Sequence, residues 1–241
     1  MIELESVTKR FGAKVAVNRL SLTVPSGEFF AFLGPNGAGK TTTIKVAVGL
    51  LRADEGTVRI CGHDILKEPV DAKSVISYVP DHPYLYDKLS GREFLEFVAR
   101  MYHLDGSSGQ ARIGELSDTL SLHEFLDDLI EGYSHGMRQR VVIAAALLHD
   151  PQVIIVDEPM VGLDPRTARI VKDILRGRAD RGAAVFMSTH ALEVAQELAD
   201  RIGIIHHGTM VAIGTLEELR RASGGAQGLE ESFLRLTAEE K

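Results

Sequence analysis

The sequence has a single cysteine, Cys61, and lacks any long hydrophobic run. One cysteine cannot form a disulfide within the chain, so we expect a reducing compartment. The longest strongly apolar run, VVIAAALL at residues 141–148, is far too short to cross a bilayer, and the first residues, MIELESVTKRFG, contain no apolar signal core. The chain is therefore not expected to be a channel or carrier itself, although it could dock onto one.

The sequence also has fewer positively than negatively charged side chains. The chain carries 27 Lys and Arg against 34 Asp and Glu, which gives a formal net charge of −7. This balance argues against a nucleic-acid-binding protein that depends on an overall basic surface, so we expect no nucleic-acid partner, although a local basic patch is compatible with it. Hydrophobic residues make up 44% of the chain, enough for the core of a soluble globular protein.

The sequence predicts mainly strands in the first third of the chain and helices in the middle. Alternating apolar positions predict a strand over 15–24, EFFAFLG predicts a buried strand, and TVRICG and VISYVP predict two more. From about residue 87 to 150 the apolar positions follow a helical period, as in GREFLEFVARMYHL. Within this part, DGSSGQ is expected to be a loop.

The last third alternates between strand and helix again. QVIIVDEP and AAVFMSTH predict strands, 166–179 and ALEVAQELAD predict helices, and IGIIHHGTMVAIG predicts a hairpin that turns near His207 and Gly208. SGGAQG is expected to be a flexible joint. The apolar stripe on the tail helix behind it, at Leu229, Phe233 and Leu236, is expected to pack against its own domain.

Alternating strands and helices predict a mainly parallel sheet covered by helices on both faces. In such sheets, ligands bind beyond the carboxyl ends of the strands. The polar loops after Leu33, Pro80, Val156 and Ser188 all follow predicted strands. We therefore expect these loops to share one edge of the sheet.

GPNGAGKT, residues 34–41, fits the phosphate-loop pattern G-x-x-x-x-G-K-[ST] between a predicted strand and a predicted helix. Glycines allow backbone turns in which amide hydrogens surround a triphosphate, Lys40 supplies charge to its terminal phosphates, and the Thr41 hydroxyl is placed to ligate Mg²⁺. Alone, the loop indicates only a nucleoside triphosphate, because kinases, GTPases and motor ATPases share it. The guanine-reading Asn-Lys-x-Asp stretch is absent, which favours adenine. The expected nucleotide contacts are Gly34, Pro35, Asn36, Gly37, Ala38, Gly39, Lys40, Thr41 and Thr42.

VIIVDEP ends a buried apolar strand with two adjacent acids. Their side chains leave the strand end in different directions, so one can approach the metal while the other faces the space beyond the γ-phosphate. We expect Asp157 to hold Mg²⁺ through its water shell and Glu158 to be the general base for the attacking water.

Four stretches together resemble the ATP-binding cassette (ABC) ATPases, in the family's order: GPNGAGKTT, YSHGMRQR, VIIVDEP with GLDP, and MSTH. The details are most similar to the separate cassette subunits of bacterial ABC-2-type transporters, which often act as exporters. The resemblance implies an α/β fold: a phosphate-loop NTPase core with a mainly parallel sheet, an N-terminal antiparallel β subdomain and a helical insertion over about 87–150. Residues 2–220 would form the ATP-binding domain, and 221–241 a linker and short tail helix.

The resemblance also implies a head-to-tail dimer with a second copy of the chain or a homologous ABC subunit. Ser134 and Gly136 of one subunit would close on the γ-phosphate held by the Lys40 loop of the other. The residues themselves are compatible with this, because the loop precedes a predicted helix whose N-terminus attracts anions. Ser134 can also serve as the N-cap of that helix, and the two roles are compatible.

Three further positions carry over from the family. Phe11 matches the aromatic residue that stacks on adenine, and Asp164 in GLDP matches the acid that links the two sites across the interface. His190 matches the switch histidine, which contacts the γ-phosphate and helps to position the water. The catalytic residues implied are thus Glu158, His190 and Lys40.

Four positions depart from the family pattern, and two of them, Tyr133 and Met137, stand where the family has leucine and glutamine around Ser134. Asp81 in YVPDHP stands where the family usually has a glutamine that contacts Mg²⁺ and senses the membrane partner, and His135 stands where it has glycine. Aspartate can ligate Mg²⁺, so we expect Asp81 in the metal site with Thr41 and Asp157, with altered hydrolysis and coupling. The alternative is that Asp81 merely caps a turn.

The matches predict an ATPase that uses ATP and Mg²⁺ and energises a transmembrane permease, as an exporter. The permease would dock near residues 81–90 and on the helical insertion, with Tyr84 and Tyr86 as contacts or as local packing. The chain would then be cytoplasmic and peripheral on the inner face of the cell membrane. Two alternatives stay open. A soluble ABC ATPase of DNA repair or translation usually has a long coiled-coil insertion or tandem cassettes, and a small-molecule kinase leaves YSHGMRQR without a role.

Overall fold

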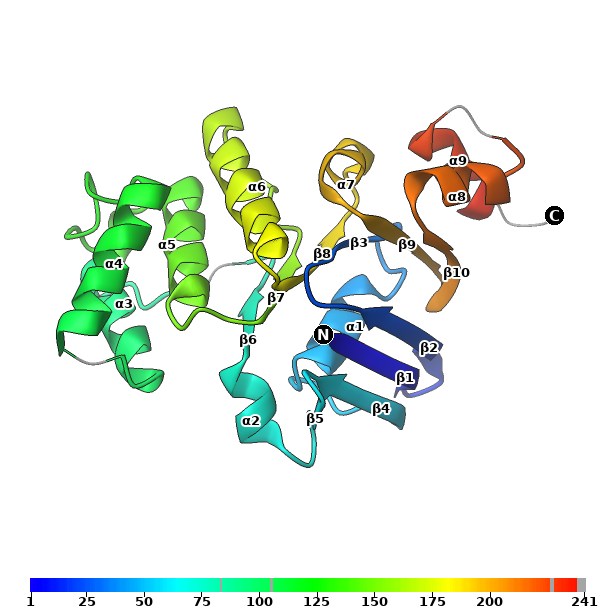
Figure 1. The fold of residues 1–241 in the computed structure, drawn as a ribbon, viewed down its shortest axis with the longest axis horizontal. Coiled ribbons are helices and arrows are strands. Elements are labelled where there is room, and N and C mark those ends of the chain that lie inside the picture. The colour runs from blue at the N-terminus through cyan, green and yellow to red at the C-terminus, as the bar shows by residue number, and fades with distance from the viewer. Residues whose placement is uncertain (83, 105, 226–227, 238–241) are drawn as a thin grey trace.

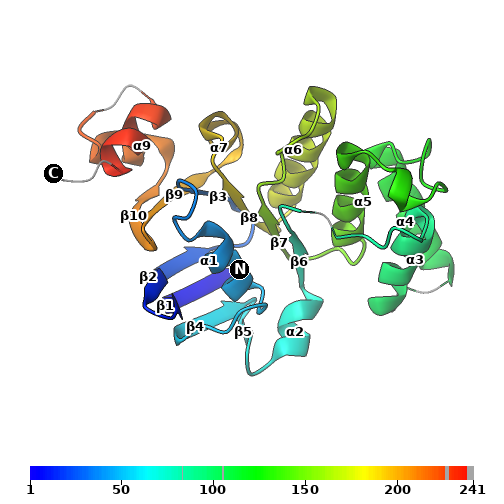
Figure 2. The same ribbon diagram turned by 180° about the vertical axis from the view of Figure 1, so that it is seen from behind.

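The computed structural model describes residues 1–82, 84–104, 106–225 and 228–237. Helices α3, α4 and α5 lie at one end of the molecule and α8 and α9 at the other, with two β-sheets between them (Figure 1), as the view from behind also shows (Figure 2). In these ranges, no helix is both long and apolar enough to pass through a lipid bilayer.

The first sheet is antiparallel and comes from the N-terminal strands. Its order is β2-β1-β4-β5, and its members are β1 (Ile2–Phe11), β2 (Lys14–Val24), β4 (Glu55–Ile60) and β5 (His63–Asp64). In the β1–β2 hairpin Phe11 pairs with Lys14, and Gly12 in the turn takes the left-handed φ of +58° that glycine adopts readily. The expected antiparallel β subdomain is therefore confirmed.

The second sheet is mainly parallel, as the alternation of strands and helices predicts. Its order is β10-β9-β3-β8-β7-β6, in which β10 pairs antiparallel with β9 and the other pairings are parallel. The central strands β3, β7 and β8 are buried along their whole length, which is why their sequences are unbroken apolar runs. The members are β3 (Phe29–Leu33), β6 (Ile76–Val79), β7 (Val153–Asp157), β8 (Ala184–Thr189), β9 (Arg201–His206) and β10 (Thr209–Gly214). The β9–β10 hairpin turns at His207 and Gly208, as predicted.

Helices cover both faces of this sheet. Consecutive residues Phe29 and Phe30 of β3 belong to different cores, since successive side chains of a strand point to opposite faces. The Phe29 core packs against α3, α4, α5 and α6, and the Phe30 core packs against α1 and the antiparallel sheet. The helices are α1 (Lys40–Ala47), α2 (Pro69–Ser74), α3 (Gly91–Met101), α4 (Gly106–Leu120), α5 (His135–Leu147), α6 (Pro165–Asp180), α7 (Leu192–Leu198), α8 (Leu216–Ala222) and α9 (Leu229–Thr237), with a 3₁₀ turn η1 (Ile130–Gly132).

One loop prediction in the helical middle is wrong. From Gly106 onward, the stretch DGSSGQ forms the first turn of α4. Gly109 allows this turn to pack closely on the chain that follows α3, because a Cβ there would clash with the carbonyl oxygen of Leu104. Gly109, which favours a loop in the sequence, thus serves close packing in the structure. The helix forms because the apolar positions of helical period continue at Ile113, which is buried in the core.

The C-terminal segment folds back on the parallel sheet. Leu229, Phe233 and Leu236 of α9 pack with Ile202 of β9 and Leu219 of α8. The predicted apolar stripe therefore packs against its own domain. Part of the expected joint SGGAQG lies outside the described residues.

Candidate functional site

The carboxyl ends of β3, β8, β7 and β6 lie at one edge of the parallel sheet. Their registers place Leu33 opposite Thr189, and Asp157 opposite Ser188. The segments that follow these strands therefore begin side by side, as the sequence predicts. These segments carry the glycine-rich loop, Asp81, Glu158 and His190.

The glycine-rich loop wraps around the start of α1. Gly39, the N-cap of α1, has a φ of +112°, and a Cβ there would clash with the carbonyl oxygen of Ala16, so the position requires glycine. The Lys40 side chain is 7% exposed and folds back over the loop, where Nζ donates to the Gly34 carbonyl oxygen at 2.7 Å. Loop amides and the lysine charge are thus gathered at a helix N-terminus, an arrangement that binds phosphate.

A cavity of about 400 Å³ opens over this loop. Its rim includes Phe11, which is 50% exposed and has Lys9 Nζ 5.6 Å from its ring centroid. An exposed ring face at the rim of a phosphate-binding cavity can stack on a purine base. The lining residues are Phe11, Lys14, Ala16, Pro35, Asn36, Gly37, Gly39, Lys40, Thr41, Thr42, Asp81 and Glu158.

Asp157 is fully buried at the end of β7. One carboxylate oxygen accepts a hydrogen bond from the Ser188 hydroxyl, and the other has no hydrogen-bond partner among the described residues. Burial raises the pKa of Asp157 above its usual range, the hydroxyls of Ser188 and Thr41 oppose the shift, and the carboxylates of Asp81 and Glu158 reinforce it.

This environment fits a divalent cation. A cation beside the carboxylates of Asp81, Asp157 and Glu158 would relieve their mutual repulsion and the burial penalty of Asp157. The oxygen atoms of Thr41, Asp81 and Asp157 are hard donors of the kind that Mg²⁺ prefers. The unpartnered buried oxygen of Asp157 is the observation that supports the fit.

Glu158 stands between two other predicted catalytic residues. Its Oε1 is 3.6 Å from Lys40 Nζ, and its Oε2 is 3.0 Å from His190 Nδ1 and accepts a hydrogen bond from the His190 amide at 3.3 Å. The residue has a left-handed φ of +50°, a conformation that costs a non-glycine residue about 1–3 kcal/mol and is often found at functional sites. Contacts at both ends of the carboxylate fix the side chain at the cavity.

Asp81 caps its own turn and also lies at the cavity. Its Oδ1 accepts a hydrogen bond from the His82 amide at 2.9 Å, and its Oδ2 lies 3.0 Å from His82 Nδ1, so the side chain does cap its own turn. It also lines the cavity and acts electrostatically on Asp157. The binding of Mg²⁺ by Asp81 stays a prediction.

Ser134, Gly136 and Asp164 are not among the described residues that line this cavity. Ser134 is the N-cap of α5 and accepts from the Met137 amide at 3.3 Å, as predicted. Asp164 is the N-cap of α6, and the hydroxyl of Thr167, which donates to it at 2.6 Å, is the main cause that lowers the pKa of Asp164. A single chain therefore does not bring these residues to its own phosphate loop.

Three contributors were missed from the sequence. Lys14 and Ala16 line the cavity beside Phe11, and Ser188 donates to Asp157. Lys14 has a detectable signal, because it follows the FGA turn and pairs with Phe11 across the hairpin. The role of Ser188 depends on the neighbouring positions of β7 and β8, which the sequence pattern does not determine.

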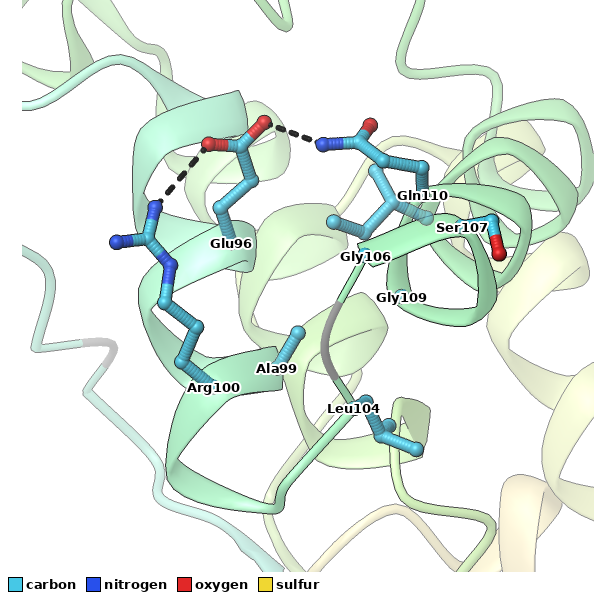
Figure 3. Close-up of a pocket in the computed structure, with 9 residues that line it drawn as sticks. Glu96, Ala99, Arg100, Leu104, Gly106, Ser107, Gly109 and Gln110 are labelled. Atoms are coloured by element: carbon cyan, nitrogen blue, oxygen red, sulfur yellow. Dashed lines mark hydrogen bonds and ion pairs between the residues drawn. The ribbon is translucent and has the colours of Figure 1, made fainter.

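A second cavity, of about 300 Å³, lies between α3 and α4 (Figure 3). Gln110 Nε2 donates to Glu96 Oε1 at 2.8 Å, and Arg100 lies 3.5 Å from the same carboxylate. These polar side chains are engaged with each other, and their surroundings are largely aliphatic. The cavity therefore does not resemble a catalytic site.

The sequence profile of a family described as "ABC transporter" matches residues 17–161. The chain is similar to the linearmycin resistance ATP-binding protein LnrL of Bacillus subtilis (strain 168), with 38% identity over 241 residues that cover 97% of this chain and 78% of LnrL. It is also similar to the daunorubicin/doxorubicin resistance ATP-binding protein DrrA of Streptomyces peucetius, with 40% identity over 223 residues, 92% of this chain and 68% of DrrA.

Solved structures show the same likeness. The ATP-binding subunit of an ABC transporter has a TM-score of 0.93 at 32% identity, over 99% of this chain and 100% of that one. The ATP-binding cassette MJ0796, in a dimeric post-hydrolysis state bound to ADP and Pi, has a TM-score of 0.83 at 26% identity, over 89% of this chain and 98% of that one.

Proposed function

Because this chain belongs to the ATP-binding cassette family of ABC transporters, we propose that it couples ATP hydrolysis to export through a membrane permease. Its relatives are ATP-binding subunits named for resistance to linearmycin and to daunorubicin, which favours the exporter over the soluble ABC ATPase. By analogy with these two names, the proposed cargo is a toxic compound removed from the cell. The chain would then work on the inner face of the cell membrane.

In the proposed reaction, water attacks the γ-phosphorus of ATP, the bond from that phosphorus to the β–γ bridging oxygen breaks, and ADP and phosphate form. Loop amides and Lys40 hold the phosphates and neutralise charge on the transferring group. Glu158 accepts the proton of the attacking water, and His190, through its contact with Glu158, keeps that carboxylate directed at the cavity. Thr41, Asp81 and Asp157 would hold Mg²⁺, which supplies further charge neutralisation at the phosphate oxygens when bound.

The observation that carries this function is the position of the Glu158 carboxylate between Lys40 and His190 at the cavity. Glu158→Gln keeps the shape of the side chain but removes the base, so we expect ATP hydrolysis to fall by about 10²–10⁴-fold while ATP binding is retained. Hydrolysis is measured as phosphate release, and trapped dimers by light scattering with ATP. Glu193→Gln, an exposed acid in the first turn of α7, is the matched control. Hydrolysis by Glu158→Gln at the wild-type rate would reject the assignment of the base.

A second subunit supplies the missing part of the proposed site. The exposed N-termini of α5 and α6 carry Ser134 and Asp164, and both lie away from the cavity of their own chain. A helix N-terminus attracts anions, so the Ser134 end of α5 suits the γ-phosphate of a nucleotide on another chain. We infer a head-to-tail dimer in which ATP joins the chains and hydrolysis releases them.

The proposed permease contact lies next to Asp81. Tyr84 is 86% exposed and Tyr86 60% exposed, and the ring of Tyr86 packs on Phe94 and Phe97 of α3, at centroid distances of 6.3 and 6.0 Å. Tyr84 lines a groove of about 230 Å³ between α3 and α5. Exposed tyrosines beside an apolar groove are typical of protein interfaces. A partner seated there would contact the segment that begins with Asp81.

A further inference from the structure

Two loops of this chain meet at adjacent helix N-termini. Helices α5 and α6 are neighbours, as both ribbon views show (Figures 1 and 2). Helix α5 begins at His135 after the Ser134 cap, and α6 begins at Pro165 after the Asp164 cap. A Cβ on Gly136 would lie 3.9 Å from Asp164 Oδ2. The first turn of α5, directly after Ser134, therefore lies close to the end of the 159–164 loop within one chain.

His135 makes the outer contact between these two loops. Its Nε2 lies 3.1 Å from the carbonyl oxygen of Val161, which accepts only, so the hydrogen bond requires a proton on Nε2. The imidazole also lies over Gly162: a Cβ on this glycine would stand 3.0 Å from the ring carbon Cδ2. Gly162 has a φ of +73°, a second reason why this position suits glycine. The imidazole of His135 thus occupies the space that is free because Gly162 has no side chain.

A second donor on the same helix face makes the inner contact. Gln139 lies one turn after His135 and donates through Nε2 to the Pro159 carbonyl oxygen at 3.5 Å. Gln139 is 2% exposed, whereas His135 is exposed. The side chains of α5 therefore hold the 159–164 loop at two points, and His135 holds the outer one.

The remaining described bonds of the outer loop are local. The Val161 amide donates to the Glu158 carbonyl oxygen at 3.2 Å, and the Leu163 amide to that of Met160 at 3.3 Å. Such turns shape the loop, and the partly buried side chains of Met160 and Leu163 pack it against the core, so His135 fixes only its outer part on α5. Because the loop starts directly after Glu158, its position also affects the chain that carries the base.

We propose that His135 is a positioning residue that fastens the 159–164 loop to the Ser134 loop, so that both approach the partner's ATP as one unit. The inference rests on the head-to-tail dimer of the proposed function. Glycine, which the family has at this position, cannot make the bond to Val161 or cover Gly162. The contact between His135 and Gly162 would hold the Ser134 loop and the 159–164 loop in place before the dimer forms. Because these loops complete the partner's site, this order lowers the entropic cost of closing the dimer.

The first experiment measures ATP-dependent dimerisation of the full chain, with Glu158→Gln in every variant to stop hydrolysis. We expect His135→Gly and His135→Phe to raise the dimer dissociation constant by about tenfold, equivalent to about 1.4 kcal/mol. Phe keeps the ring but has no donor, whereas His135→Gln offers an amide donor and should restore most of the affinity. ATP affinity of the monomer, measured at low chain concentration, should be unchanged. His123→Gly, at an exposed histidine paired with Asp118, is the control.

Dimerisation of His135→Gly or His135→Phe with the parent's dissociation constant would overturn the inference. So would a His135→Gln variant that is as weak as His135→Gly, because the hydrogen bond would then carry no positioning effect.

The second experiment tests the contact of the ring with Gly162. Gly162→Ala should weaken dimerisation in the parent, because the methyl group strains the backbone and displaces the imidazole. In the His135→Gly background only the backbone strain remains, so the added loss should be several-fold smaller. This non-additivity supports the inference, and strictly additive losses contradict it.

A third variant separates failure of this inference from failure of the dimer. Ser134→Asp keeps a good N-cap but places a negative charge against the triphosphate, and should prevent dimerisation. If it does so while the His135 variants match the parent, only the role of His135 is wrong. If Ser134→Asp dimerises like the parent, the dimer itself is wrong, and the inference that rests on it falls as well.

Discussion

The two parts of the proposed site differ in how much of their geometry one chain provides. The phosphate-loop part is internally held: Lys40 is buried and bonded to its own loop, Asp157 is bonded to Ser188, and Glu158 lies between Lys40 and His190. The Ser134 part is exposed and consists of two capped helix N-termini. One chain therefore offers a preformed surface for a nucleotide, whereas in the proposed site a second chain completes its surroundings.

Removal of the Lys40 charge should have the largest effect on ATP hydrolysis, because Lys40 lies in the part of the site that binds the nucleotide first. Lys40→Ala should lower ATP hydrolysis by about 10³-fold or more and greatly weaken nucleotide binding, since no other described lysine lies in the loop itself. Fluorescent-nucleotide titration and phosphate release check this. Lys14→Ala, at the rim of the same cavity, should have a much smaller effect. Full activity of Lys40→Ala would reject the assignment of the phosphate loop.

A negative charge introduced at position 134 should greatly slow ATP hydrolysis but leave ATP binding by the monomer unchanged. Ser134→Asp should lower hydrolysis by about 10²-fold without weakening ATP binding by the monomer, because Asp is as good an N-cap as Ser but repels the γ-phosphate. Ser134→Asn keeps the cap without the charge, and should lose about tenfold at most. Equal rates for the Asp and Asn variants would show that no anion approaches this helix N-terminus.

The buried acid links function and stability in the phosphate-loop part. Because burial raises the pKa of Asp157, its ionised form destabilises the folded chain at neutral pH, and this penalty disappears as the pH falls through the folded pKa toward the usual value of 3.8. Without nucleotide or metal, Asp157→Asn should therefore increase the free energy of unfolding at pH 7. The gain should shrink in acid.

Urea denaturation between pH 4.5 and pH 8 measures this difference. The same variant should lose the Mg²⁺-dependent part of its stabilisation by ATP. A destabilised Asp157→Asn at pH 7, or a gain that grows in acid, would contradict the assignment of a charged, unpartnered carboxylate oxygen.

Substitution of an exposed tyrosine should have the smallest effect on the isolated chain. Tyr84→Ala should change the free energy of unfolding by less than about 0.5 kcal/mol and leave ATP binding unchanged, because the side chain is largely in solvent. In membranes it should reduce co-purification with the permease. Val70→Ala, at another exposed apolar residue, on α2, is the control. Undiminished co-purification of the Tyr84 variant would place the permease elsewhere.

Local signals in the sequence predict most of the first part of the site. The spacing of glycines around Lys40 and the acids that end an apolar strand each depend on a few consecutive residues, and the structure places the corresponding groups at one sheet edge. Ser188 and Lys14 were missed because their roles depend on which strands are neighbours. Gly109 was misread because its contact is with the chain after α3.

The second part is less accessible to sequence reasoning. The contact between His135 and Gly162 arises from the packing of α5 beside α6, which no periodicity encodes. The approach of Ser134 to a nucleotide is a relation between two chains, so it stays a prediction that depends on the family resemblance.

Complementation between two inactive variants tests the two-chain site most directly. Mixed dimers of Lys40→Ala and Ser134→Asp contain one wholly intact site, formed by the Lys40 loop of one chain and the Ser134 loop of the other. We expect the equimolar mixture to hydrolyse ATP well above the sum of the separate variants, because only the mixed dimers contain an intact site. A mixture no more active than that sum, although mixed dimers are demonstrated by tagged pull-down, would contradict the account.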